Sequence, residues 1–138
     1  MPRRINNISR YRFIELVSQL KDALYFLSKQ REIPGTPDFS YLKNLLDQYN
    51  WLVNVHFSGM ELTIFHYIDC LGDIDFIKYL ISIGGNPWLP DLYGRSGVDF
   101  SRILLEEMKL HKMDNRRIDL FTEINKILED TFQSRNTR

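Results

Sequence analysis

The sequence predicts an all-α protein made of short helices in pairs, with extended loops between the pairs. Apolar residues recur at spacings of three and four through most of the chain, which is the pattern of helices that bury one face. Clusters of proline and glycine interrupt this pattern. Two of the apolar segments also follow a hydroxyl residue, Thr63 or Ser96, and these residues are 33 positions apart. A period of about 33 residues is typical of stacked helical repeats.

The first part of the chain predicts one long helix and one short helix. The long helix should cover about 20 residues, end near residues 31–32 and be broken by Pro34 and Pro37. Its buried stripe is expected to consist of Ile14, Val17, Leu20, Leu24 and Leu27, widened by Phe13, Leu16, Ala23 and Phe26. The short helix should cover residues 38–49, with Asp38 as its N-cap. Residues 50–62 then predict a loop or a short extended hairpin.

The second part predicts two further pairs of helices. A short helix over residues 63–71 is halted by Gly72, and the next helix ends at the pair Gly84 and Gly85. Residues 86–94, NPWLPDLYG, predict a second extended loop because they contain two prolines and a terminal glycine. A helix from Ser96 to about residue 111 and a last helix over residues 115–133 complete the chain.

The segment ELTIFHYIDCLGDIDFIKYLISIGGNPWLPDLYGRSGVDFS, residues 61–101, resembles an ankyrin repeat followed by the start of the next repeat. The matching positions are Thr63, Phe65, His66, Gly72, Ile77, Leu80, Ile81, Gly84, Asp91, Gly94 and Ser96. The chain departs from the family pattern where Ile64 and Gly97 replace the proline at the start of the inner helix. It also departs at Leu105, where the glycine that stops this helix is missing.

This resemblance implies one domain, residues 1–138, that forms a stack of antiparallel helix pairs with projecting finger loops. Two to three divergent repeats would occupy residues 38–113. The longer end segments, residues 1–33 and 114–138, would act as capping helices, because the end units of a stack must shield it from water.

The residues at the helix starts have a structural explanation that does not depend on the resemblance. The hydroxyls of Thr63 and Ser96 can accept bonds from the free N–H groups of a helix start. The residues three positions later, His66 and Asp99, can return a bond to the cap, which forms a capping box. Gly72 would let the helix stop and the chain reverse, and Gly84 can adopt a left-handed conformation.

Charge and cysteine content exclude several classes of protein. The chain has 18 basic and 18 acidic residues, so it lacks the basic excess of proteins that coat nucleic acid. The N-terminal arm, with Arg3, Arg4, Arg10 and Arg12, remains an alternative nucleic-acid site. A single cysteine excludes an internal disulfide and fits a reducing, cytoplasmic compartment. No apolar run approaches the length of a membrane span, so no membrane association is expected.

The sequence does not predict an enzyme, a metal site or a cofactor. Asp73 and Asp75 are two positions apart on a helix and therefore point to different faces, which is poor geometry for a metal or an acid–base pair. His66 and Cys70 are four positions apart, and a cysteine-dependent enzyme centred on them is a second alternative. The expected role of Cys70 is to fill the core.

The leading hypothesis is a module that binds another protein. The finger at residues 86–95 contains Trp88, Leu92, Tyr93 and Arg95, and tryptophan, tyrosine and arginine are enriched at binding hot spots. The ankyrin resemblance further implies that Asp69, Cys70 and Arg102 face the concave side, where such proteins hold partners. The protein would act as an adaptor or an inhibitor, as stand-alone modulators do. Such modulators include bacterial effectors, immunity-type inhibitors and viral regulators, and a secreted effector would work in the host cytosol or nucleus.

Overall fold

The computed structural model describes residues 8–30 and 38–136 of the protein, with side chains as far as residue 131. Within these residues every regular element is a helix, as predicted, and the one β-type pairing is an isolated bridge between Phe57 and Leu62. The α-helices are α1 (Arg10–Gln30), α2 (Ser40–Gln48), α3 (Ile74–Ser82), α4 (Gly97–Leu110) and α5 (Asn115–Asn136), and the 3-10 helices are η2 (Asn50–Asn54) and η3 (Ile64–Cys70).

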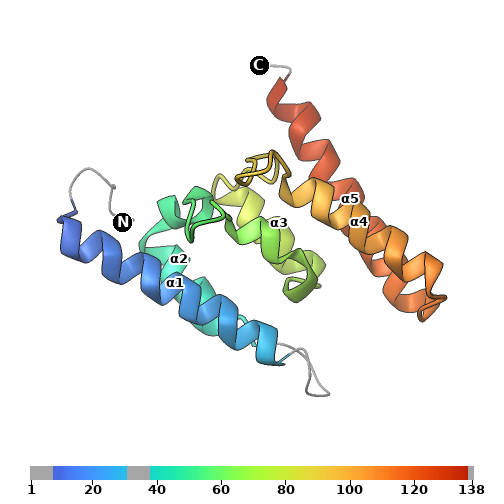
Figure 1. Ribbon diagram of the computed structural model, residues 1–138, viewed down its shortest axis with the longest axis horizontal. Coiled ribbons are helices and arrows are strands. Elements are labelled where there is room, and N and C mark those ends of the chain that lie inside the picture. Colours follow the sequence, from blue (N-terminus) through green and yellow to red (C-terminus); the bar gives the residue numbers. More distant parts are fainter. Residues whose placement is uncertain (1–7, 31–37, 137–138) are drawn as a thin grey trace.

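The helices lie in a row from the N-terminal to the C-terminal end (Figure 1). Helix α1 packs against α2 and η3, and η3 in turn packs against α4. Helix α5 lies along α4 and also contacts α3. The two long helices, α1 and α5, therefore stand at opposite ends of the row, with the shorter elements between them (Figure 1).

One continuous core runs through this row, and Phe65 is at its centre. The Phe65 ring is fully buried. A Cβ atom added to Gly97 would lie 2.5 Å from the Cβ of Phe65, and one added to Gly85 would lie 2.9 Å from its ring. Real Cβ atoms do not approach so closely. Gly97 therefore lets η3 pack against the start of α4, and Gly85, after α3, leaves space for the Phe65 ring.

Helix α1 forms where the sequence predicts it, but it is rotated relative to the predicted stripe. Leu16 and Ala23, assigned to the edge of the stripe, are buried. Ile14 and Phe26 are instead 57% and 51% exposed. The prediction of an inward-facing Ile14 and Phe26 is therefore wrong. A stripe of apolar residues this wide leaves the direction of the helix open until its neighbours are known.

The segment after α1 also differs from the expectation. The N-cap of α2 is Phe39, which makes no side-chain capping bond, so the prediction of Asp38 as N-cap is wrong. Asp38 lies one residue before the cap, and its carboxylate accepts a bond from the Ser40 N–H at 3.0 Å. The carboxylate thus serves the turn before the helix. Part of the predicted loop is the 3-10 helix η2, and the extended hairpin is limited to the Phe57–Leu62 bridge.

The central pair, η3 and α3, is separated at Gly72 as predicted, although η3 is a 3-10 helix with non-helical dihedrals at Tyr67. A Cβ on Gly72 would lie 3.2 Å from the Phe121 ring of α5. Gly72 therefore also makes room for α5. Asp73 is the N-cap of α3 and accepts a bond from Phe76 N–H at 2.8 Å, and Gly84 has the left-handed φ of +99°.

None of the helices in residues 8–30 and 38–136 combines the length and the apolar character of a membrane-spanning segment.

Candidate functional site

Two finger loops lie side by side and are joined by hydrogen bonds. We define the first finger as residues 55–62 and the second as residues 86–95. The Leu92 N–H donates to the Met60 carbonyl at 2.8 Å, and a ring nitrogen of His56 lies 3.1 Å from the Pro90 carbonyl. At the base, the Asn54 side chain donates to the Gly84 carbonyl and accepts from the Asn86 N–H. These bonds hold the tips in a fixed relation to each other.

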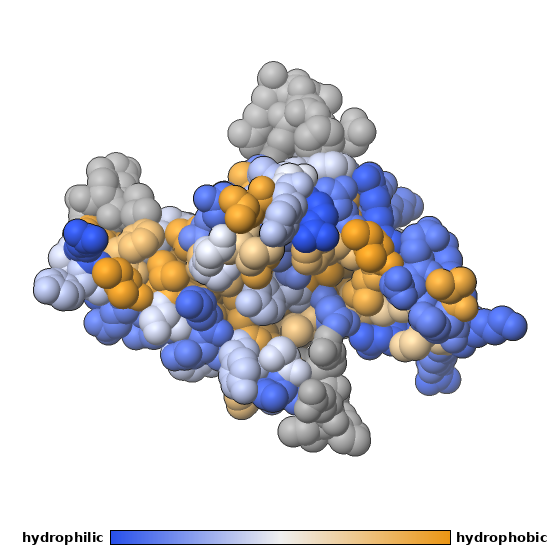
Figure 2. All heavy atoms as spheres, in the orientation of Figure 1, coloured by the Kyte–Doolittle hydropathy of each residue, from blue (hydrophilic) through white to orange (hydrophobic). Residues whose placement is uncertain are grey.

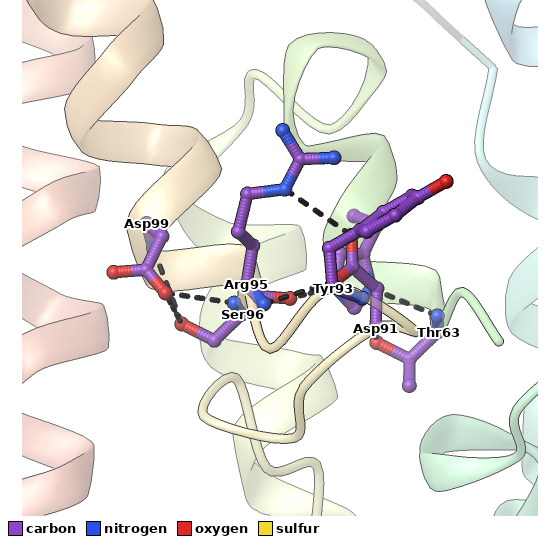
Figure 3. Close-up of polar contacts among 7 residues, drawn as sticks. Thr63, Asp91, Tyr93, Arg95, Ser96 and Asp99 are labelled. Atoms are coloured by element: carbon purple, nitrogen blue, oxygen red, sulfur yellow. Dashed lines mark hydrogen bonds and ion pairs between the residues drawn. The ribbon is translucent and has the colours of Figure 1, made fainter. Parts of the chain in front are cut away.

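Asp91 organises the second finger from inside. Its side chain is fully buried, and one carboxylate oxygen accepts bonds at 2.9 Å from the N–H groups of both Tyr93 and Arg95. Burial alone would raise the pKa of Asp91. The two N–H bonds and the positive charge of Arg95 outweigh burial, and the pKa of Asp91 lies below its ordinary value. Asp91 therefore stays ionised and fixes the turn from which Tyr93 and Arg95 project (Figure 3).

The capping box at Thr63 connects η3 to this finger. The Thr63 N–H donates to Nδ1 of His66 at 2.9 Å, so this nitrogen must be the unprotonated one. The other ring nitrogen, Nε2, therefore carries the proton and donates to the Arg95 carbonyl at 2.7 Å. His66 is buried, and its ring bridges the start of η3 and the second finger.

The second capping box, at Ser96, follows the finger directly. The Ser96 N–H donates to a carboxylate oxygen of Asp99 at 2.8 Å, and the Asp99 N–H donates to the Ser96 hydroxyl at 3.2 Å. Both predicted boxes are thus present. Together they hold Arg95 between them, with its backbone fixed on both sides (Figure 3).

The Arg95 side chain extends from the finger across the start of α4. Its guanidinium lies 3.6 Å from the Asp91 carboxylate. It also lies over two rings, at 5.5 Å from the centre of the Tyr93 ring and 5.2 Å from that of Phe100. Arg95 therefore joins the finger tip, represented by Tyr93, to the surface of α4, represented by Phe100.

Beyond Arg95, a groove of about 320 Å³ runs between η3 and α4. Its floor and walls are mainly apolar. Ile103 is 51% exposed within it, so the groove presents apolar surface to solvent. The groove is lined by His66, Ile68, Asp69, Arg95, Phe100, Ile103, Leu104 and Glu107.

Two carboxylates lie along the groove, and each has a basic side chain beside it. Asp69 lies 3.5 Å from the guanidinium of Arg117 on α5. Glu107, whose side chain is 59% exposed, lies 3.3 Å from the His111 ring, which is charged only when protonated. The Glu107 carboxylate is the more exposed of the two, with 59% of its side chain exposed against 37% for Asp69.

The finger tips present a second apolar surface. Leu92 and Tyr93 are 54% and 67% exposed, and Met60 on the first finger is also exposed. We call Met60, Leu92 and Tyr93 the finger-tip patch. Apolar side chains also emerge among charged ones in several separate places on the face drawn in Figure 2. The finger-tip patch differs from scattered apolar residues because a backbone bond holds its two fingers together and Arg95 continues it toward the groove.

The structure places the predicted binding residues in two groups. Leu92, Tyr93 and Arg95 are exposed on the second finger, and Asp69 and Arg95 line the groove. Cys70 is buried and does not line the groove, so its predicted concave-side exposure is wrong.

Trp88 and Arg102 lie on the α5 side of the molecule. The Trp88 indole N–H donates to the Leu128 carbonyl of α5 at 3.3 Å. Arg102 lies over the Trp88 ring and pairs with Glu129 of α5 at 2.8 Å. Arg102, predicted to bind the partner, is thus paired with α5 and does not line the groove. Trp88 anchors the finger to α5.

Sequence reasoning missed the contribution of α4 to the groove. Phe100, Ile103, Leu104 and Glu107 are spaced at i, i+3, i+4 and i+7, which places them on one face. A separate buried stripe of α4 contains Val98, Ser101, Leu105 and Met108. The two apolar stripes of α4 are visible in the sequence. A helix of this kind can bury one stripe in the core of its own protein and leave the other exposed for a partner.

Of the arginines in the N-terminal arm, Arg3 and Arg4 lie outside the described residues, and Arg10 is exposed at the start of α1. Arg12 donates to the Tyr49 hydroxyl at 2.8 Å and to Glu15 at 2.6 Å. In the proposed cysteine centre, both ring nitrogens of His66 are engaged in the capping box and the finger, and Cys70 is buried. The described part of the chain contains no cluster of metal-ligating side chains.

Comparison of the chain with protein-family models, with curated protein sequences and with solved structures finds no match. A function is therefore inferred from the groove, the finger-tip patch and the contacts that join them.

Proposed function

We propose that the protein is a small protein-binding module of the ankyrin-repeat type, which holds a partner protein against the finger-tip patch and the groove and acts as an adaptor or inhibitor. The observation that carries this proposal is the position of Arg95. Its side chain lies over Tyr93 of the finger-tip patch and over Phe100 of the groove. The two exposed surfaces are therefore adjacent and rigidly connected, as a single binding face requires.

The repeat interpretation is supported by which helices pack together. The starts of η3 and α4 are 33 residues apart, carry the same capping box and pack against each other. The helices that follow them, α3 and α5, also pack against each other. Equivalent elements of successive units thus lie side by side, with the fingers joined beside them, which is how stacked repeats bury a common core.

The composition of this face also supports binding to a protein. Tyrosine and arginine are enriched among residues that contribute most to protein interfaces. Asp91 and the capping boxes fix the backbone at Tyr93 and Arg95, so little conformational entropy is lost when a partner binds. The groove adds half-exposed apolar area next to these two residues.

The proposal can be tested by affinity capture from the cells in which the protein occurs, followed by mass spectrometry. The full chain should retain a discrete partner. The double substitution Tyr93→Ala with Arg95→Ala, and separately Ile103→Asp, should each lose this partner. Tyr11→Asp is the matched control, because Tyr11 is exposed on α1, far along the chain from the proposed face.

Circular dichroism and thermal unfolding should show that all variants remain folded. Tyr93 and Ile103 are more than half exposed, and the bonds that Arg95 makes to Asp91 and His66 through its backbone are kept by alanine. A partner that is retained equally by wild type and by both face variants would contradict the proposal. So would a partner that only Tyr11→Asp releases.

A further inference from the structure

The walls of the groove offer few backbone groups to a partner, so they suit a partner segment whose own backbone is already hydrogen-bonded. Its lining residues come from η3 and α4, whose backbone groups bond within helices, and from Arg95. The Arg95 N–H donates to Asp91, and its carbonyl accepts from His66. An extended segment laid here would find no strand edge to pair with. A helical segment satisfies its own backbone and presents only side chains.

The spacing of the lining residues sets the length of such a segment. Phe100, Ile103, Leu104 and Glu107 form an i, i+3, i+4, i+7 row along α4, and Ile68 faces the groove from η3. At a rise of about 1.5 Å per residue, the row from Phe100 to Glu107 is about 10 Å long. Two turns of a partner helix, with apolar residues at i, i+3 and i+4, would cover it.

The charges along the groove set the polarity of the segment. At the finger end, the Arg95 charge is compensated by Asp91 and its guanidinium is covered by two rings. At the other end, the Glu107 side chain is more than half exposed beside the His111 ring. Asp69 lines the groove from η3, but Arg117 lies 3.5 Å from its carboxylate, so Glu107 is the carboxylate that a partner's cation would meet. A cation is therefore favoured at the Glu107 end, whereas the Arg95 end requires no charge.

We propose that the occupant of the groove is a basic amphipathic helix of a partner protein, with its apolar residues over Phe100, Ile103 and Leu104 and a lysine or arginine one turn further along, against Glu107. This inference rests on the proposed function and specifies the partner that the same site would accept. It places the partner helix alongside α4, with helix-to-helix packing at the usual distance of about 8–10 Å.

The test uses two peptide libraries displayed on phage and selected against the full chain. One has a helical alanine-rich frame with positions i, i+3, i+4 and i+7 randomised. The other has an extended frame with alternating randomised positions. The helical library should yield peptides with apolar residues at the first three positions and lysine or arginine at the fourth. The extended library should yield none that compete with them.

Selected peptides are then synthesised with a fluorescent label, and their Kd values are measured by anisotropy. Ile103→Asp should weaken binding at least tenfold, because it places a charge in the apolar floor. Glu107→Lys should weaken binding about fivefold, since a partly exposed ion pair is replaced by repulsion. Changing the peptide lysine to glutamate should restore binding to Glu107→Lys. Glu123→Lys reverses an exposed charge on α5 and serves as the control, and it should leave the Kd of the peptide unchanged.

The outcomes separate this inference from the proposed function. Peptides that lose binding with Ile103→Asp but ignore Glu107→Lys would overturn the basic polarity and leave the groove as the binding site. Enrichment of extended peptides that compete at the groove would overturn the helix. No enrichment, or binding that Ile103→Asp leaves unchanged, would overturn the inference. The proposed function would then depend on the affinity capture alone.

Discussion

The helix starts at Thr63 and Ser96 use the same capping box, but they differ in what lies beyond it. In the first box, His66 is buried and its second ring nitrogen donates to the Arg95 carbonyl of the next finger. In the second box, Asp99 is partly exposed, and its other oxygen lies 3.9 Å from Arg102 in the same helix. The first box therefore connects η3 to the second finger, and the second stays within α4.

This difference follows from position in the chain and from side-chain chemistry. An imidazole has two nitrogens on opposite sides of its ring, so it can cap a helix and reach a neighbouring finger at once. After α4, the chain makes a turn at Lys112 and enters α5 in place of another finger. The last box has no finger to reach, and the shorter carboxylate of Asp99 suffices.

The largest effect should come from Gly97→Ala, which acts where the two helix starts meet. An added Cβ would lie 2.5 Å from the Phe65 Cβ and 2.7 Å from the Phe65 carbonyl oxygen. Backbone must move to relieve this overlap, and we expect a loss of about 3 kcal/mol in the free energy of unfolding, measured with urea. Gly59→Ala is the control, because no described atom lies within 4 Å of its added Cβ. Equal stability of the two variants would contradict the packing.

His66→Ala should have the next largest effect. It removes the acceptor of the buried Thr63 N–H and the donor to the Arg95 carbonyl. The expected loss is about 2–3 kcal/mol, since a buried N–H then has no partner. Amide exchange should also increase in the second finger, and a variant whose finger stays protected would show that His66 does not join the two units.

Asp99→Ala should cost less, about 1 kcal/mol, which is typical for the loss of a local cap. The comparison of the two boxes predicts that this loss leaves exchange in the second finger unchanged. Urea unfolding of the two cap variants under the same conditions measures the difference. A loss from Asp99→Ala equal to that from His66→Ala would remove the distinction between connecting and local caps.

The smallest effect should be an acid-dependent one from Asp91. Its pKa is lowered in the folded protein, so ionised Asp91 stabilises the fold above the pKa of the unfolded chain, about 3.9, and this stabilisation is lost as the pH falls below that value. At pH 5 the free energy of unfolding of Asp91→Asn should therefore be lower than that of wild type. This difference should become smaller as the pH falls to about 2–3. A difference that is constant over this range would contradict the lowered pKa.

The five α-helices and the two capping boxes could be predicted because they depend on residues close together in the sequence. Ser96 and Asp99 are three positions apart, and so are Thr63 and His66, so each box is visible locally. The all-helical class follows from the same local patterns. The ankyrin resemblance remains a prediction, supported by the packing of equivalent elements.

Features that depend on distant segments could not be predicted. Arg102 pairs with Glu129, 27 positions away, and nothing near Arg102 in the sequence indicates this partner. Gly97 looks like a weak helix start until Phe65 is found against it. Ile103 looks like an ordinary helix residue until the neighbouring stripe proves to be the buried one. The groove could therefore not be predicted, because the sequence does not show which stripe of α4 is buried.

The central claim is that the exposed surface from the finger tips to the groove holds a partner protein. Photo-crosslinking in the native cell tests it most directly, with benzoylphenylalanine placed at position 103 in the groove and, as control, at position 11 on α1. We expect one discrete crosslinked partner from position 103 and none of the same mass from position 11. No crosslink from position 103, or the same product from both positions, would contradict it.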